Sequence, residues 1–158
     1  DPNVTDVNFC YLRYADVVLM AAEAYNETDN TPEAWKLLNS VRKRAGAREI
    51  TTANYTELMK EKVYKLNFIS DGDDAGKFRT ALYWERGFEL AFEGQRKYDL
   101  IRWGIIKEAL TLFSNRSSVK SAYPAGENFQ KGKHELFPIP LDELQLNPMF
   151  ENKNNPNY

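Results

Sequence analysis

The chain is poor in the residues that build disulfides and metal sites. Its 158 residues include one cysteine, Cys10, and one histidine, His134. A single cysteine excludes a disulfide within the chain. One histidine with no cysteine nearby leaves too few ligands for a conventional zinc site. We therefore expect a fold without a structural metal, a cross-link or a cofactor.

Long apolar runs and an excess of charge of one sign are missing as well. No stretch approaches the roughly 20 apolar residues of a membrane-spanning helix. The 21 basic and 23 acidic side chains leave a net charge of -2, which gives no electrostatic reason to expect binding to nucleic acid or to an anionic membrane. A content of 42% hydrophobic and 28% charged residues is typical of a folded globular protein, and the length suits one domain, residues 1–158.

The chain is rich in helical periodicity. Apolar residues recur at helical spacing in residues 12–26, 34–45, 55–68, 77–93, 95–103 and 105–113, and strand signals are nearly absent. The middle of the first segment is apolar almost all round, so this helix is expected to be buried on more than one side. The sequence predicts an all-α fold with an irregular, loop-rich C-terminal tail.

Turn and cap residues divide the first two helices. Thr31, Pro32 and Glu33 predict a helix start with threonine as the cap, and Gly46 stands where a left-handed cap ends that helix. Two helices joined by a short polar turn predict an antiparallel hairpin, close in length to one tetratricopeptide unit. No second copy with the same spacing follows.

Charged residues concentrate between positions 85 and 103. Glu85 and Glu89 lie four residues apart and share a helix face, and a glycoside hydrolase would need such a carboxylate pair. Arginines close in sequence, Arg86, Arg96 and Arg102, favour a different interpretation, because bidentate ion pairs explain these residue types without catalysis. We predict a structural polar network with these members: Glu85, Glu89, Arg96, Asp99 and Arg102.

Two loops are candidates for ligand contact. Residues 71–76 begin like a calcium loop, but Ala75 and Leu82 replace two of its ligands, so a solvated turn is the expectation. Residues 114–133 form a polar loop too long for a passive connection. Aromatic and amide side chains bind sugars, so its candidate ligand-binding residues are Tyr123, Asn128 and Phe129. The alternative is that the rings hold the loop to the domain.

Four segments together resemble the SusD/RagB family and come in the order typical of that family. They are LRYADVVLMAAEA at 12–24, LNSVRKRAG at 38–46, ERGFELAFEGQRKYDLIRW at 85–103, and a tail with FPIP at 137–140, Asn147-Pro148 and NPNY at 155–158. The family's penultimate glycine is Asn157 here, and asparagine also tolerates a left-handed conformation. Residues 51–76 do not align.

The resemblance implies the C-terminal region of such a protein, and hence a fragment of a longer chain. It implies a non-catalytic lipoprotein on the outer face of the outer membrane of a Bacteroidetes-type bacterium. Such a protein binds oligosaccharide or another nutrient, and its partner is a TonB-dependent transporter. The lipid-bearing cysteine lies upstream in the family, so Cys10 does not take that role.

Two alternatives remain at the level of the sequence. The first is a helical scaffold that contacts the partner barrel while the glycan site lies in residues upstream. The second is an enzyme, a glycoside hydrolase that uses Glu85 or Glu89. Titration with oligosaccharides separates the scaffold from the binding protein, and a hydrolysis assay tests the enzyme.

Overall fold

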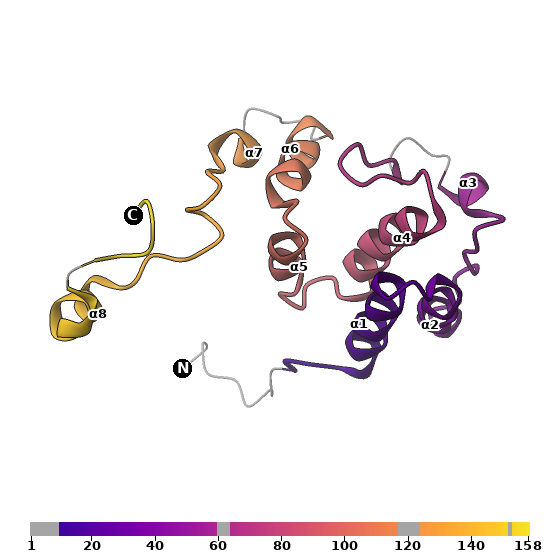
Figure 1. The fold of residues 1–158 in the computed structure, drawn as a ribbon, viewed down its shortest axis with the longest axis horizontal. Helices are drawn as coiled ribbons and strands as arrows, with labels where there is room; N and C mark the ends of the chain where they lie inside the picture. The colour runs from indigo at the N-terminus through magenta and orange to yellow at the C-terminus, as the bar shows by residue number, and fades with distance from the viewer. Residues whose placement is uncertain (1–9, 60–63, 117–123, 152) are drawn as a thin grey trace, which may run out of the picture. The chain divides into compact units, whose positions relative to one another are not determined.

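The computed structural model describes residues 10–59, 64–116, 124–151 and 153–158. The chain forms two compact units, Asp1–Arg96 and Lys97–Tyr158. All regular elements in the described ranges are helices (Figure 1), so the all-α class is confirmed. The single domain over residues 1–158 stays a prediction.

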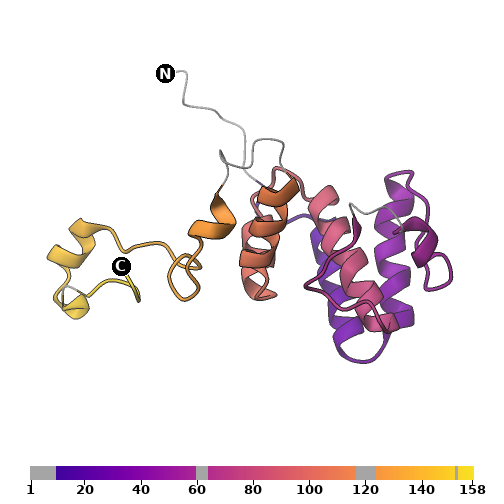
Figure 2. The ribbon, with the colours of Figure 1, turned by 90° about the horizontal axis from the view of Figure 1, so that it is seen from above.

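Three long helices make up most of the first unit. They are α1 (Tyr14–Glu27), α2 (Thr31–Arg44) and α4 (Asp74–Glu89), and the four-residue α3 (Tyr55–Leu58) comes between α2 and α4 along the chain. The long helices lie side by side in both views (Figures 1 and 2). The predicted hairpin of α1 and α2 is confirmed.

Contacts between the helices give their directions. Asp16 near the start of α1 pairs with Arg86 near the end of α4, and Glu27 at the end of α1 pairs with Arg79 in the first half of α4; α1 and α4 are therefore antiparallel. Trp35 meets Phe78, and Arg42 meets Glu85, so both α2–α4 contacts join residues 43 positions apart. A constant offset is the mark of parallel helices in register.

The core of the first unit lies between these helices. Its largest side chains with essentially no exposed surface are Leu19, Leu38, Ile50, Phe78 and Leu82, and Phe78 meets the Trp35 ring edge to face at 5.1 Å. The sequence also predicted that Phe88 and Phe92 lie on the apolar face of this helix. This prediction was wrong, because both side chains are exposed and Phe92 lies beyond the end of α4.

The starts of α2 and α4 differ from the sequence expectation. Thr31 is the first residue of α2 and its hydroxyl donates to Asn26, so Asn30 and not Thr31 precedes the helix. α4 starts earlier than predicted, since Asp73 accepts from the backbone N–H of Gly76 at 2.7 Å and caps it. Gly46 has the expected left-handed φ of +71°.

The predicted helix over residues 55–68 is wrong in its extent. α3 ends at Leu58, residues 60–63 lie outside the described residues, and residues 65–70 are irregular. Tertiary contacts hold this segment and the chain just before it. Trp84 Nε1 of α4 donates to the Tyr64 carbonyl at 2.9 Å. The Asn39 amide donates to the Ile50 carbonyl at 2.6 Å and accepts from the Ile50 N–H at 2.8 Å, which draws the chain back onto α2.

A tight turn follows α4. The helix ends at Glu89, four residues before the predicted end, and the chain then passes through left-handed conformations at Phe92 (φ +64°) and Gly94 (φ +77°). Glycine takes this conformation without strain, whereas a phenylalanine there needs the surrounding structure to hold it. α5 (Arg96–Arg102) comes next.

The second unit contains α6 (Ile106–Arg116), α7 (Ala125–Asn128), α8 (Leu141–Leu146) and the 3-10 turn Pro148–Phe150. A Cβ on Gly126 would lie 2.6 Å from the backbone of Thr111. The approach of α7 to α6 therefore requires glycine at position 126.

Side chains bind the backbone of the irregular tail. Asn154 donates to the Ile139 carbonyl at 3.2 Å and accepts from the Ile139 N–H at 2.8 Å. Asn157, with φ +69° as the sequence predicted, donates to the Gly132 carbonyl at 3.0 Å. The Tyr158 hydroxyl donates to a backbone carbonyl at 3.0 Å. Asparagine and tyrosine side chains thus provide hydrogen-bond partners for backbone groups of this irregular segment.

Candidate functional site

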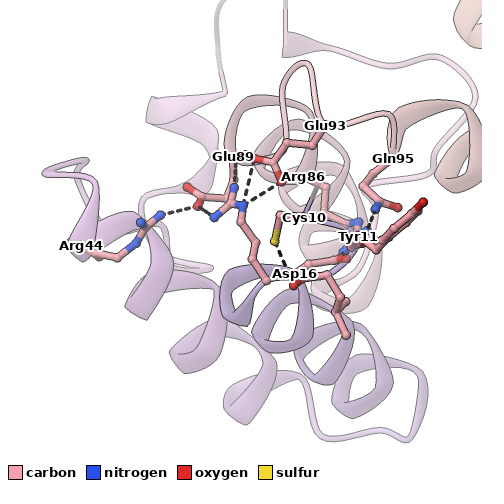
Figure 3. A network of polar contacts seen from close by, with 10 residues as sticks. Cys10, Tyr11, Asp16, Arg44, Arg86, Glu89, Glu93 and Gln95 are labelled. Atoms are coloured by element: carbon pink, nitrogen blue, oxygen red, sulfur yellow. Dashed lines mark hydrogen bonds and ion pairs between the residues drawn. The ribbon is translucent and has the colours of Figure 1, made fainter. Parts of the chain in front are cut away.

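Glu89 of the predicted network lies close to Glu93 at the C-terminal end of α4 (Figure 3). Arg13, just before α1, donates through Nε to both oxygens of Glu93, at 2.7 and 2.9 Å, and through Nη1 to Glu89 at 2.6 Å. Its remaining Nη2 donates to the backbone carbonyl of Glu89, one of the carbonyls that a helix end leaves without a partner. These bonds, above all those that Arg13 donates to Glu93, hold the pKa of Arg13 above its ordinary value.

Glu89 receives a second arginine. Arg44, the last residue of α2, also binds its carboxylate, so one side chain of α4 joins the segment before α1 to the end of α2. Arg44 is exposed and Glu89 is largely covered, with 60% and 9% of their side-chain surfaces accessible. Half of this contact therefore faces solvent, and its main effect is to fix the relative position of the helix ends.

Glu85 lies one turn deeper. It binds Arg42 of α2, and only 6% of its side chain is accessible. Burial raises its pKa above the ordinary glutamate value, and the Arg42 hydrogen bond works in the opposite direction. The raised pKa reflects the free-energy cost of burying the Glu85 charge. The Arg42 guanidinium offsets part of that cost.

The most buried ion pair joins α1 to α4. Asp16 Oδ1 lies 2.8 Å from Arg86 Nη1, with 6% and 3% of the two side chains accessible. The sequence assigned Arg86 to the neighbouring glutamates, and the structure corrects this partner. Asp16 carried a signal that could have identified it: an acid flanked by apolar residues near the start of a largely apolar helix is buried only with a partner.

The remaining predicted members of the network, Arg96, Asp99 and Arg102, have other partners. Arg96 donates to the backbone carbonyl of Tyr83 at 2.8 Å, and its guanidinium lies 3.9 Å above the Tyr83 ring. Asp99 and Arg102, in α5, bind each other at 2.9 Å. The expectation that Arg96 and Arg102 neutralise the two glutamates is therefore corrected: the observed partners are Arg13, Arg42 and Arg44, from 43 to 76 residues away.

The arrangement leaves little room for acid and base catalysis. Each of the two glutamates is bound by at least one guanidinium, as described above. A hollow of about 210 Å³ opens nearby between α1 and α2, and Arg13, Tyr14, Ser40 and Arg44 contribute to its lining. Neither glutamate lines it. What this geometry does is connect three helices through opposite charges.

The loop predicted to bind a ligand is described in part. Tyr123 lies outside the described residues. Asn128 is exposed at the end of α7, whereas Phe129 is only 7% exposed and meets the His134 ring edge to face at 5.8 Å. The Phe129 ring is therefore largely covered and offers little surface for a sugar. Ligand contact by these residues stays a prediction.

The described ranges contain neither a candidate metal-binding group nor a helix suited to cross a membrane. Within residues 10–59, 64–116, 124–151 and 153–158, no three His, Cys, Asp or Glu side chains form a group that could hold a metal ion. In the calcium-like loop, Asp71 accepts from the Tyr55 hydroxyl at 3.2 Å and Asp73 caps α4. No helix of the described part has both the length and the apolar character needed to cross a membrane.

Comparison with known proteins places the chain. Residues 1–158 match the profile of the SusD family. The SusD-like protein P25 of Formosa agariphila is 38% identical over 143 residues, which are 90% of this chain and 23% of that protein. The SusD-like protein P2 of the same bacterium is 32% identical over 155 residues, 98% of this chain and 26% of that protein.

A solved structure agrees in both fold and sequence. The crystal structure of a SusD homolog from Bacteroides thetaiotaomicron superposes with a TM-score of 0.70 and 35% identity, over 98% of this chain and 28% of that one. The chain therefore spans about a quarter of the length of these relatives. The profile match over the whole chain, the identities and the shared fold together show that the chain belongs to the SusD family.

Proposed function

We propose that the chain is the helical C-terminal part of a nutrient-binding protein that is not an enzyme. Membership of the SusD family over residues 1–158 carries this proposal. The nutrient is an oligosaccharide, and the partner is a TonB-dependent transporter in the outer membrane. The whole protein lies on the extracellular face of that membrane, held by a lipid anchor upstream of these residues.

The geometry supports a role without catalysis. Glu85 and Glu89, the residues a hydrolase would use, are bound by arginines and largely withdrawn from solvent. We propose that the polar network of Glu85, Glu89, Arg96, Asp99 and Arg102 is structural. Arg96→Ala removes the bond to the Tyr83 carbonyl and the contact with its ring, so it should lower the unfolding free energy by about 1–3 kcal/mol. Lys36→Ala on the exposed side of α2 is the control and should leave stability unchanged.

Calorimetric titration of the whole protein with a panel of oligosaccharides tests the binding function. The best ligand is then titrated against Asn128→Ala, with Gln145→Ala in α8 as the control outside the loop, since both amides are exposed in the second unit. Weaker binding in Asn128→Ala alone supports ligand contact by this loop. Release of reducing ends during long incubation, lost in Glu85→Gln or Glu89→Gln, would support the hydrolase instead.

A second candidate function is a scaffold for the partner barrel, with the glycan site elsewhere in the protein. The buried Phe129 ring favours it, because a covered ring offers no face for stacking on a sugar. Unchanged oligosaccharide affinity in Asn128→Ala, Tyr123→Ala and Phe129→Ala, with binding to the transporter intact, is the result that would select the scaffold.

A further inference from the structure

A hollow of about 290 Å³, named here the Trp35 pocket, opens at the end of the first unit where α2 and α4 begin. This end is opposite to the one that carries Glu85 and Glu89. The segment that follows the tethered Ile50 forms another side of the hollow. The lining combines hydroxyl, indole, carboxylate and apolar groups and includes Thr31, Pro32, Trp35, Thr51, Thr52 and Asp74.

One wall of the Trp35 pocket carries a buried donor without an acceptor. Trp35 is only 7% exposed, and its edge-to-face contact with Phe78 holds the ring in place. In the part of the chain that the structure describes, its Nε1 has no hydrogen-bond partner. A buried indole N–H normally has one. Because Trp35 lines the hollow, a molecule bound there can bring an acceptor to this N–H.

The threonine hydroxyls of the lining keep both donor and acceptor capacity. Thr31 Oγ1 donates to Asn26 Oδ1 at 3.0 Å, so its lone pairs remain for a ligand. Thr51 Oγ1 accepts from the Asn54 N–H at 3.3 Å, so its proton remains. A ligand hydroxyl donates one hydrogen bond and accepts others, and donors beside acceptors therefore suit a molecule rich in hydroxyls.

The charge of the lining disfavours an anion. Asp74 is a lining residue, and Lys77, which pairs with it at 3.5 Å, is not. Helix starts bind anions through unoccupied amide groups. Here the Asn30 carbonyl accepts from two N–H groups in the first turn of α2, and Asp73 accepts from one in the first turn of α4. An ammonium ion is disfavoured as well, because it has no acceptor to offer the indole N–H.

We propose that the Trp35 pocket binds one neutral sugar residue. A hydroxyl or the ring oxygen of the sugar accepts from Trp35 Nε1, the threonines bind neighbouring hydroxyls, and the exposed Asp74 accepts from a hydroxyl at the rim. The volume lies near the lower limit of the roughly 300–1,000 Å³ of small-molecule pockets, which suits a single ring and not a chain. The proposal rests on the proposed function only in the class of ligand, and the site is separate from residues 114–133.

Fluorine NMR of the whole protein labelled with fluorotryptophan tests the Trp35 pocket. The Trp35 resonance is assigned by its loss in Trp35→Phe. Glucose, galactose and mannose are titrated separately, and glucuronate is the acidic comparison. A single ring makes few contacts, so we expect a dissociation constant on the order of millimolar. The Trp35 resonance should shift saturably with at least one hexose, and glucuronate should bind more weakly than that hexose.

Matched variants locate the binding. Thr52→Val removes a hydroxyl from the lining and keeps the shape of the side chain, and Thr56→Val does the same on the exposed side of α3, outside the lining. Thr52→Val should weaken hexose binding about 5-fold, as expected for one lost hydrogen bond, and Thr56→Val should not change it. Circular dichroism checks that both variants are folded.

Three results would each overturn the proposal. They are no shift of the Trp35 resonance with any hexose, the same affinity in Thr52→Val as in the wild type, and tighter binding of glucuronate than of every hexose. The oligosaccharide titration keeps this test apart from that of the proposed function. Oligosaccharide binding without any hexose effect at Trp35 refutes the pocket alone, whereas hexose binding at Trp35 without oligosaccharide binding supports the pocket and counts against the proposed function.

Discussion

The ion pair between Asp16 and Arg86 allows a sharp test of how the helices are held together. Asp16→Asn keeps the size and an acceptor oxygen but removes the charge that faces Arg86 at 2.8 Å. Two unit charges at that distance attract with about 6 kcal/mol at an effective dielectric constant of about 20. Removal of one partner of a buried pair typically costs about 3–5 kcal/mol, since the other charge stays buried.

A matched pair on the same two helices provides the control. Glu27 and Arg79 also join α1 to α4, but 46% and 47% of their side chains are accessible. Exposed pairs contribute about 0–1 kcal/mol, so Glu27→Gln should cost little where Asp16→Asn costs several kcal/mol. The Arg79 hydrogen bond lowers the pKa of Glu27, so its small contribution is present above about pH 4.5 and is lost as the pH falls through the lowered pKa.

Urea unfolding followed by circular dichroism measures both variants. The double variant Asp16→Asn with Arg86→Gln should lose less than the sum of the two single losses, because each single change already removes the attraction that the two residues share. If Asp16→Asn and Glu27→Gln destabilise the protein equally, burial does not control the strength of these ion pairs and the reasoning is wrong.

Three further predictions concern other parts of the first unit. Leu38→Ala, at a fully buried position, should lower the unfolding free energy by about 2–5 kcal/mol; a thermal melt identical to that of the wild type would remove Leu38 from the core. Gly76→Ala should destabilise the protein strongly in the same assay because its Cβ would clash with the Ser70 carbonyl, whereas Gly72→Ala meets nothing closer than 3.8 Å and should be nearly neutral. Burial raises the pKa of Tyr55 to about 12, so the folded state holds this proton longer than the unfolded state and stability falls from about pH 10 to 12; Tyr55→Phe should flatten that fall in unfolding measured at several pH values.

The sequence predicted what is decided locally. The hairpin of α1 and α2 follows from periodicity, a polar turn and the left-handed Gly46, all of which act within a few residues. The helix expected over residues 55–68 ends early, and distant residues hold the chain there: Asn39 binds both backbone groups of Ile50 just before the segment, and Trp84 Nε1 donates to the Tyr64 carbonyl within it. Helical periodicity does not report such a tertiary contact.

The candidate site was likewise predictable from the sequence only in its local part. The sequence identified Glu85 and Glu89 as a pair on one helix face, since a spacing of four suffices for that. It assigned arginines close in sequence, whereas Arg42 and Arg13 come from 43 and 76 residues away. Ion pairs between helices depend on how the helices pack, so they become visible only with the fold.

One device occurs in both units and gives the protein a chemical weak point. An asparagine side chain binds both the N–H and the carbonyl of an isoleucine, Asn39 with Ile50 and Asn154 with Ile139. Slow hydrolysis of the amide to a carboxylate leaves only acceptors, so the isoleucine carbonyl loses its donor and meets a negative charge. Chemical ageing of two side chains would thus loosen both units, and the fold that covers Asn39 also delays its own decay by excluding water.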